Sequence, residues 1–433
     1  MFEPDIETAP WSDQAQRDEP LYRAQIEYLL QHSRFFKDKL AAAGFRSAGA
    51  VGGLKAIAAL PLTEKDELRQ SRTSDEPIGA HRTAPREEIV RIYSTSGTTG
   101  TPSYIPLTAS DLEVWVRTSA RSYAASGVAR GERIVSTYNA GPFVAGATLA
   151  AFDRLGLCHI PVGAGNTERL MAAVDLLKPT VVAMTPSYAL YLSEWAQRRG
   201  VDLARSSVRR VMVAGEPGGG EAAMRAQLEA AWGASVTEAM GIGDISVSLW
   251  GECEAKSGMH FSGRGFVHFE IIDPSTGAVK PLASDAEGEL VLTHLVNRSA
   301  PLLRFRTRDH VRLRMGPCPC GRTAPRLRCI GRTDDMLIVR GVNVFPSAVR
   351  EIVNEFAPAV TGVILIQPRV AGVRQEPPLP VRVETAPGAS TEGLAERIRT
   401  RLRDKLVVTT YIEFAPAGSL PRSEYKSKLV EKV

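Results

Sequence analysis

A run of hydroxyl and glycine residues, Ser94–Thr101, is the part of the chain best suited to binding a polyanion, because every residue in it is Ser, Thr or Gly. Glycines let the backbone approach a ligand closely, and N–H groups and short hydroxyls can donate to phosphate oxygens. No Lys-Ser or Lys-Thr follows the last glycine, which excludes the common G-x-x-x-x-G-K-[ST] loop. A flexible linker is the alternative. The strand-like flanks Ile89–Tyr93 and Tyr104–Leu107 favour a phosphate loop with a tight connection.

Cysteine and histidine residues that could bind a metal form a second set of candidate functional residues. Cys253-x₆-His260 and Cys318-Pro-Cys320 each place two ligands close together in sequence, and the two pieces could close one tetrahedral structural zinc site. Cys329 is a competing ligand. The alternative is a set of isolated buried thiols and a surface histidine. An odd number of cysteines, five in a large chain, does not suggest a disulfide framework.

Length and composition indicate an ordinary globular protein of at least two domains. The chain has 433 residues, 44% of them hydrophobic, and a small net charge of +5. Its arginine-rich stretch 298–340 lacks aromatic interleaving, so no nucleic-acid partner is expected. No apolar run is long enough to span a membrane, and the acidic start does not resemble a signal peptide. We expect a cytoplasmic protein with no membrane partner, which could form a homodimer.

Short apolar runs alternate with helical patterns in the middle of the chain. Residues 133–137, 180–185 and 208–214 have the pattern of buried strands, and residues 167–177, 188–199 and 220–232 that of helices. This alternation is typical of a parallel sheet covered by helices. Residues 21–43 predict a helix with Pro20 at its start. Shorter strands and more turns over 262–314 predict a β-rich subdomain.

A domain boundary is expected near Gly331–Asp335, beyond which the pattern becomes β-α-β on a smaller scale. The predicted class is therefore α/β. Residues 1–332 would form a large N-terminal domain with parallel-sheet layers and the β-rich subdomain. Residues 333–433 would form a small, mobile α+β domain.

Seven further motifs follow the loop in a fixed order. They are Gly215–Pro217, Glu238–Asp244, Arg304–Asp309, Cys318–Thr323, Gly331–Leu337, Arg340–Pro346 and Pro421–Lys426. The set resembles the adenylate-forming (AMP-binding) superfamily, and specifically its phenylacetate–CoA ligase branch. The resemblance runs from about residue 20 to the C-terminus, and the stretch Gly331–Pro346 is the most specific part of it.

The resemblance implies two steps: a carboxylate displaces pyrophosphate from ATP to give an acyl-adenylate, and a thiol then displaces AMP. The residues implied to hold the β- and γ-phosphates are Ser96, Gly97, Thr98, Thr99 and Gly100. The residues implied around the rest of the nucleotide are Gly215, Glu216 and Pro217 at the adenine, Glu238, Met240 and Gly241 beside them, Asp309 at the ribose hydroxyls, and Arg332 at ribose and phosphate. The first step needs charge stabilisation at a phosphoryl group.

Lys426 matches the lysine that the family places over the α-phosphate during adenylation. A mobile point charge suits an oxygen that gains charge only in the transition state. The alternative is a solvated lysine in a basic tail, since Lys428 and Lys432 lie close by in sequence. Asp334 falls at the family's hinge, where rotation of the small domain would exchange Lys426 for a thiol-binding surface. A plain turn is the alternative there.

The chain departs from the branch at residues 240–244, where an aromatic-Gly-x-Ser/Thr-Glu motif is usual. Met240 replaces a tyrosine, so a polarizable contact remains but a hydroxyl is lost. Asp244 replaces the glutamate expected to hold Mg²⁺, and a bridging water could cover its shorter reach. Related ligases imply a structural zinc at Cys253, His260, Cys318 and Cys320.

The acid-binding pocket is expected to form from Tyr138, Ala140, Gly141, Pro142, Gly241 and Ile242. These residues are small or apolar, which suits a compact aromatic or short branched acid. We expect an aromatic acid and coenzyme A as the acceptor. Transfer to a carrier-protein phosphopantetheine or to an amine is an alternative, and a nucleotide-binding protein without catalysis is a second one, because the motif at 240–244 is altered.

Overall fold

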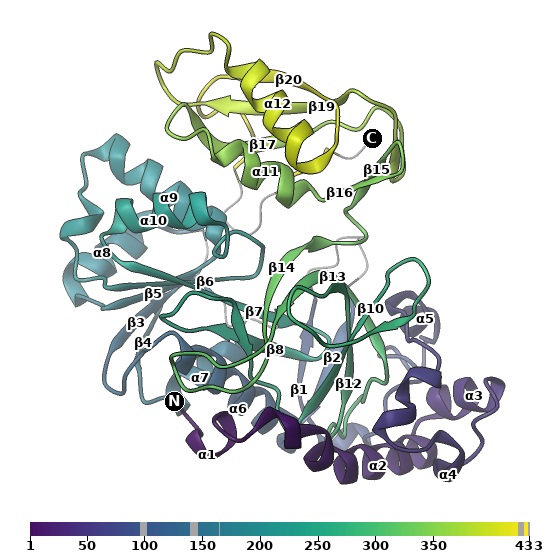
Figure 1. Ribbon diagram of the computed structural model, residues 1–433. Helices are drawn as coiled ribbons and strands as arrows, with labels where there is room; N and C mark the ends of the chain where they lie inside the picture. The colour runs from purple at the N-terminus through teal and green to yellow at the C-terminus, as the bar shows by residue number, and fades with distance from the viewer. Residues whose placement is uncertain (96–101, 139–145, 164, 423–427, 432–433) are drawn as a thin grey trace. The chain divides into compact units, whose positions relative to one another are not determined.

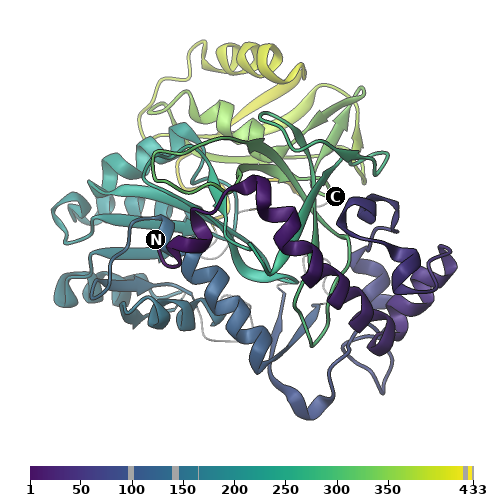
Figure 2. The same ribbon diagram turned by 60° about the horizontal axis from the view of Figure 1, so that its bottom comes forward.

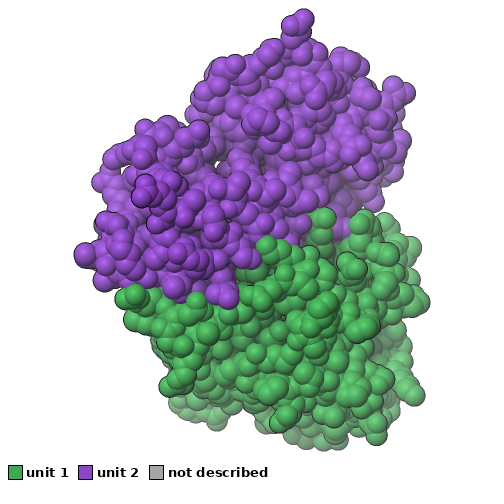
Figure 3. Space-filling view, turned by 60° about the vertical axis from the view of Figure 1, so that its left-hand side comes forward, with its two compact units in different colours: residues 1–163, 237–307, 311–328 green, residues 164–236, 308–310, 329–433 purple. Residues whose placement is uncertain are grey.

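The computed structural model describes residues 1–95, 102–138, 146–163, 165–422 and 428–431, in two compact units (Figure 3). Unit 1 comprises residues 1–163, 237–307 and 311–328, and unit 2 comprises residues 164–236, 308–310 and 329–433. Strands β7 (Ser235–Ile242), β13 (Phe305–Arg314) and β14 (Arg326–Arg332) contribute residues to both units. None of the described helices is both long and apolar enough to cross a membrane.

Unit 1 begins with helices and continues into a mostly antiparallel β region (Figure 1). Its helices are α1 (Pro4–Glu7), α2 (Gln14–His32), α3 (Arg34–Ala42), α4 (Ala48–Val51), α5 (Lys65–Gln70), α6 (Ala109–Ala125) and α7 (Ala147–Arg154). The strands that lie wholly within it are β1 (Ile89–Ser94), β2 (Tyr104–Thr108), β3 (Arg133–Ser136), β4 (Cys158–Pro161), β8 (Ser246–Glu252), β9 (Met259–Phe261), β10 (Val267–Ile272), β11 (Val279–Lys280) and β12 (Glu287–His294).

The expected strands around the polyanion loop are present, since β1 and β2 pair antiparallel with Ser94 opposite Tyr104. Strands β3 and β4 pair in parallel, and β10 pairs antiparallel with β11 and β12. The β-rich character expected for residues 262–314 is thereby confirmed. Helices α2 and α3 pack together (Figure 2) and contribute Tyr22, Ile26 and Phe36 to the main apolar core of the unit.

The prediction that Pro20 starts the first long helix is wrong, because α2 begins at Gln14 and contains Pro20. Buried polar contacts hold the preceding turn in place. Gln14 Nε2 donates to Asp18 Oδ1 at 2.8 Å, and Arg264 Nε donates to Gln14 Oε1 at 2.6 Å. The bond within α2 and the tertiary contact from Arg264 stabilise the first turn of the helix, before the hydrogen bond that Pro20 cannot make.

Unit 2 contains a parallel β–α part, within residues 164–236, and a mixed C-terminal part, within residues 329–433. The first has strands β5 (Val181–Met184) and β6 (Arg210–Ala214), which pair in parallel, and helices α8 (Thr167–Leu177), α9 (Pro186–Arg199) and α10 (Ala222–Trp232). The second has strands β15 (Leu337–Val339), β16 (Val342–Val344), β17 (Val360–Ile366), β18 (Arg374–Gln375), β19 (Leu379–Thr385) and β20 (Thr410–Ala415), with helices α11 (Pro346–Asn354) and α12 (Leu394–Leu406). The predicted α/β class is confirmed.

Strand β19 is the central strand of a three-stranded sheet in the mixed C-terminal part. It is antiparallel to β17 and parallel to β20. The inward residues Val381 and Val383 of β19 are fully buried and share an apolar core with Ile398 and Leu402 of α12. Alternation along β19 and the helical spacing in α12 therefore produce one core, as the sequence pattern predicts.

Candidate active site

The residues implied to bind nucleotide lie on several elements, with Glu238–Asp244 in unit 1 and Gly215–Pro217, Asp309 and Arg332 in unit 2. Ser96, Gly97, Thr98, Thr99, Gly100, Ala140, Gly141, Pro142 and Lys426 lie outside the described residues. The base of the phosphate loop is described: the Thr95 amide donates to the Ser103 carbonyl at 3.0 Å, and the Ser103 amide donates to Thr95 Oγ1 at 3.2 Å. These bonds extend the β1–β2 pairing up to the loop.

Gly215–Pro217 forms a turn directly after β6. Glu216 Oε1 accepts the Ser187 amide at 2.9 Å, at the N-terminal turn of α9. A carboxylate is favourable there, because the first N–H groups of a helix lack partners within the helix. The next residue along, Gly218, has a φ of +152°, and a Cβ on it would lie 2.8 Å from Pro186 Cβ. Only glycine therefore lets this turn pass so close to α9.

The Glu238–Asp244 motif lies on β7 and the turn that leads to β8. Glu238 is buried, and its amide donates to Glu252 Oε2 at 3.2 Å. The β7–β8 register shifts between Met240 and Ile242. A Cβ on Gly241 would lie 1.9 Å from the Val247 carbonyl oxygen, so only glycine fits this irregularity. Met240 is half-buried against the main apolar core, which gives the replacement of the usual tyrosine a packing role.

Asp244 forms an ion pair that sequence reasoning missed. Lys65 Nζ, at the start of α5, donates to Asp244 Oδ2 at 2.7 Å. The Asp244 charge also acts on His81, although burial is the larger influence and lowers the pKa of His81 to about 4. Mg²⁺ commonly takes one or two carboxylates and fills its other positions with phosphate oxygens and waters. A single carboxylate such as Asp244 fits that donor set.

Arg72 is a second cation close to this region, and it too was missed from the sequence. Its Nη1 donates to the Pro102 carbonyl at 2.9 Å, and its guanidinium lies 5.8 Å from the centre of the Tyr104 ring. Pro102 follows the Ser94–Thr101 run directly. Arg72 therefore brings positive charge to the first described residue after the run, which has no lysine of its own.

Asp309, Arg332 and Asp334, which the resemblance assigns to the ribose, the phosphate and the hinge, lie together in unit 2. Arg332 donates to both carboxylate oxygens of Asp334, at 2.9 and 2.6 Å, and its Nη1 lies 3.5 Å from Asp309 Oδ1. Burial alone would lower the pKa of Arg332, but the charges of Asp309 and Asp334 raise it above its ordinary value. The guanidinium is therefore a permanent cation held by two carboxylates.

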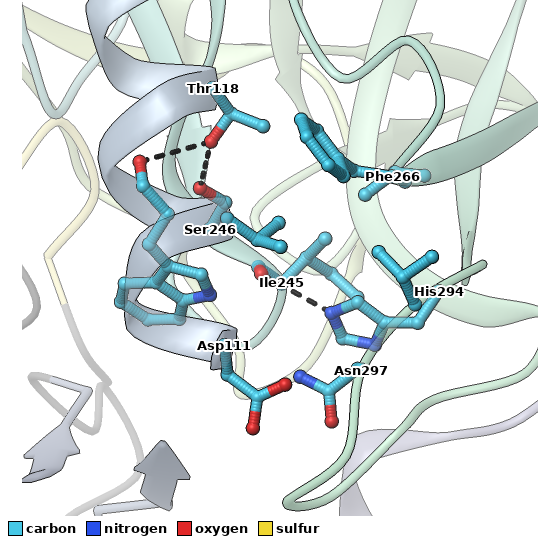
Figure 4. A pocket seen from close by; sticks show the side chains of 11 residues that line it. Asp111, Thr118, Ile245, Ser246, Phe266, His294 and Asn297 are labelled. Carbon is cyan, nitrogen blue, oxygen red and sulfur yellow. Dashed lines mark hydrogen bonds between the residues drawn. The ribbon is translucent and has the colours of Figure 1, made fainter. Parts of the chain in front are cut away.

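Only part of the predicted acid pocket is described. Tyr138 is half-buried two residues after β3, and Ile242 is buried at the end of β7. A polar cluster in unit 1 lies at the start of β8, just after the turn that carries Asp244 (Figure 4). There Thr118 Oγ1 of α6 lies 2.9 Å from Ser246 Oγ, and His294 Nε2 lies 3.3 Å from the Ile245 carbonyl oxygen. These bonds tie the turn to α6 and β12.

The buried histidines give a prediction for stability against pH. Burial lowers the pKa of His81, His268 and His294 to about 4. Their unfolded pKa is about 6.5, so between pH 6.5 and 4 the unfolded chain binds protons that the folded chain does not. The free energy of unfolding should therefore fall as the pH falls through this window. Urea unfolding at pH 7 and pH 5 measures it, and equal free energies at the two values would contradict the prediction.

Cys253, His260, Cys318 and Cys320 gather in unit 1 as one group. Their ligand atoms all lie within 4.8 Å of one another, and the first three side chains are buried. Cys253 Sγ lies 3.6 Å from Cys318 Sγ, and Cys320 Sγ lies 3.4 Å from His260 Nε2. A tetrahedral zinc with Zn–S near 2.3 Å would separate two sulfurs by about 3.8 Å. The residues present thus fit a Cys₃His zinc site.

The competing ligand Cys329 is not part of the four-residue group found among the described residues. Its Sγ instead lies 3.8 Å from the Gly331 carbonyl oxygen. His260 Nδ1 lies 3.4 Å from the Ala324 carbonyl oxygen, which would orient the ring with Nε2 toward a metal. Burial lowers the pKa of His260 to about 4, so its imidazole is neutral at physiological pH.

Comparisons with known proteins agree with these features. The family model of the AMP-binding enzymes matches residues 20–294, and that of the AMP-binding enzyme C-terminal domain matches residues 341–432. A phenylacetate-coenzyme A ligase of Thermus thermophilus is 34% identical over 98% of this chain and 97% of its own length. The phenylacetate-coenzyme A ligase of Escherichia coli is 31% identical over 94% and 89%.

The fold comparison extends the likeness to solved structures. The crystal structure of a 2-hydroxyisobutyryl-CoA ligase, in the postadenylation state with 2-HIB-AMP, has a TM-score of 0.90 to this chain. It is 26% identical, with 99% of this chain and 92% of that chain covered. The chain therefore belongs to the AMP-binding enzymes and, within them, to the phenylacetate–CoA ligase branch of AMP-forming acid–CoA ligases.

Proposed function

We propose that this protein activates an aromatic carboxylic acid of the phenylacetate type as an acyl-adenylate and then transfers the acyl group to coenzyme A. The observation that carries the proposal is the full-length likeness to phenylacetate-coenzyme A ligases. In the first step a carboxylate oxygen bonds to the α-phosphorus of ATP and pyrophosphate leaves. In the second the thiol sulfur bonds to the acyl carbon, AMP leaves, and the thiol proton passes to solvent.

Different described residues would bind different parts of ATP. Asp309 would accept the ribose hydroxyls, and Arg332, held by Asp309 and Asp334, would reach the ribose and the phosphate. The turn Gly215–Pro217 would line the adenine. Asp244 would hold Mg²⁺, which would neutralise phosphate charge. Arg72, which bonds to the Pro102 carbonyl, would add positive charge at the end of the loop segment, and Lys65 would add positive charge beside Asp244.

A panel of carboxylic acids tests which acid is the substrate. Pyrophosphate release should be measured with phenylacetate, benzoate, 2-hydroxyisobutyrate, acetate and a long-chain fatty acid. The proposal predicts the highest kcat/KM for phenylacetate or benzoate. A clear preference for 2-hydroxyisobutyrate would assign the short branched class instead. If no acid supports release although ATP binds, the protein is a nucleotide binder rather than a ligase.

Arg332→Lys tests the nucleotide assignment. Lysine keeps the charge but cannot present the planar fork that bonds to both oxygens of Asp334. We expect KM for ATP to rise about tenfold, corresponding to the loss of about 1.4 kcal/mol of binding. Arg369→Lys, which changes an exposed arginine of the same unit, should leave KM unchanged. An unaltered KM in Arg332→Lys would remove Arg332 from the nucleotide site.

A further inference from the structure

Arg350 links two parts of unit 2 that belong to different matched family regions. It lies on α11, within the C-terminal match, whereas Pro217 and Glu221 lie within the AMP-binding match. Arg350 Nη2 donates to the Pro217 carbonyl at 2.6 Å and to Glu221 Oε1 at 2.6 Å, and Nε donates to Glu221 Oε2 at 3.3 Å. One side chain thus bonds the end of the turn implied to line the adenine and the N-cap residue of α10.

The environment of this contact makes it strong and specific. Arg350 is 3% exposed and Glu221 is 4% exposed, so the ion pair is shielded from solvent. Buried charge-assisted bonds to a planar guanidinium are both stronger and more directional than neutral bonds. Leaving either charge unpaired would be costly. The position of α11 and the position of the 215–221 turn are consequently coupled.

A second ion pair joins the same two family regions. Arg422 Nη2 donates to Glu194 Oε1 of α9 at 3.0 Å, and its Nη1 donates to Glu384 Oε2 of β19 at 2.9 Å. Both arginines line a crevice of about 40 Å³, whose other walls include Ser187, Tyr191 and Met224 from one region and Gly362–Leu365 from the other. The polar ties therefore lie on either side of a small crevice between the two family regions.

We infer that Arg350 is a positioning residue for adenylation. While α11 packs against α10, Arg350 holds the Gly215–Pro217 turn in the shape that accepts ATP. The Arg422–Glu194 ion pair supports the same packing. The inference rests on the proposed function and on the domain rotation that the resemblance implies at Asp334. A move of residues 341–432 away from α9 and α10 would break both ties. Formation of the Arg350 contacts would therefore favour ATP binding and adenylation over thioester formation.

Two variants separate positioning from folding. Arg350→Lys keeps the charge, but a single ammonium cannot reproduce the fork that spans the carbonyl and both carboxylate oxygens. The double variant Arg350→Met/Glu221→Gln removes both charges at similar volume, so no buried charge remains unpaired. Arg403→Met, at an exposed arginine on α12, is the matched control.

The first readout is the Kd of a non-hydrolysable ATP analogue by calorimetry, with the melting temperature as the check on folding. We expect the double variant to melt near the wild type yet to bind the analogue about tenfold to a hundredfold more weakly. The second readout is thioester formation from saturating synthetic acyl-adenylate and coenzyme A, expected to stay within about twofold of the wild type.

Each outcome decides the inference. Unchanged Kd in both Arg350 variants would overturn it, as would an equal loss in analogue binding and in thioester formation, since that would indicate a general structural role. If the wild type forms no adenylate with any acid, the proposed function fails. The Kd comparison would still decide the role of Arg350, because it needs no turnover.

Discussion

Lys426→Ala is expected to reduce acid-dependent exchange of pyrophosphate into ATP about 10²- to 10³-fold, the loss typical of removing one preorganised group that stabilises charge in a transition state. The lysine would meet the α-phosphate oxygens as negative charge develops, so the variant should lose kcat far more than KM. Its melting temperature should match that of the wild type.

Lys428→Ala is the matched control for Lys426→Ala, because Lys428 is an exposed lysine in the same basic tail. The described residues on both sides of Lys426 are held by their own contacts, so each substitution should affect only its own side chain. Arg422 is bound by Glu194 and Glu384 on one side, and the Leu429 carbonyl accepts the Ile366 amide at 2.8 Å on the other. Equal activity in the two variants would mean that Lys426 is an ordinary solvated lysine.

Loss of the zinc ligands should have the largest effect on stability. Cys318→Ser should release the metal and lower the free energy of unfolding by about 4 kcal/mol, the stabilisation given by a ligand present at 1,000 times its Kd. The expected fall in melting temperature is about 4 °C for a chain of 433 residues. Metal analysis should find one zinc per chain in the wild type and none in Cys318→Ser.

Cys158→Ser controls for the loss of a thiol, because Cys158 is exposed and lies outside the four-residue group. Incubation with a chelator should lower the melting temperature of the wild type and leave that of Cys318→Ser unchanged. A wild type without stoichiometric zinc, whose melting temperature does not respond to the chelator, would contradict the site and leave three free thiols and a buried histidine.

Local hydrophobic patterns were enough to predict several helices and strands of the fold. Helix α8 has the bounds predicted from spacing, and β5 and β6 fall within their predicted apolar runs. Pro20 is the instructive failure: α2 begins six residues before it, at Gln14, which Arg264 contacts from 250 residues away in sequence. Such a contact leaves no periodic signal near the proline.

The residues of the candidate site also fall into a predictable and an unpredictable group. The motif residues were predictable because their order along the chain matches that of a known family, and Asp309, Arg332 and Asp334 do lie together. Lys65, Arg72 and Arg350 were not predictable, because each works through a partner 30 to 179 residues away. The sequence around Lys65, Glu64–Glu67, signals only a capping box at the start of α5.

The most direct test of the central claim is a two-stage, single-turnover experiment with the intact protein, ATP, Mg²⁺ and phenylacetate. Without coenzyme A, the account predicts pyrophosphate release and one enzyme equivalent of phenylacetyl-adenylate by mass spectrometry. Addition of coenzyme A should convert that adenylate into phenylacetyl-CoA and AMP. Formation of the adenylate with no thioester on addition of coenzyme A would contradict the assigned acceptor, and formation of neither product with any aromatic acid would contradict the account as a whole.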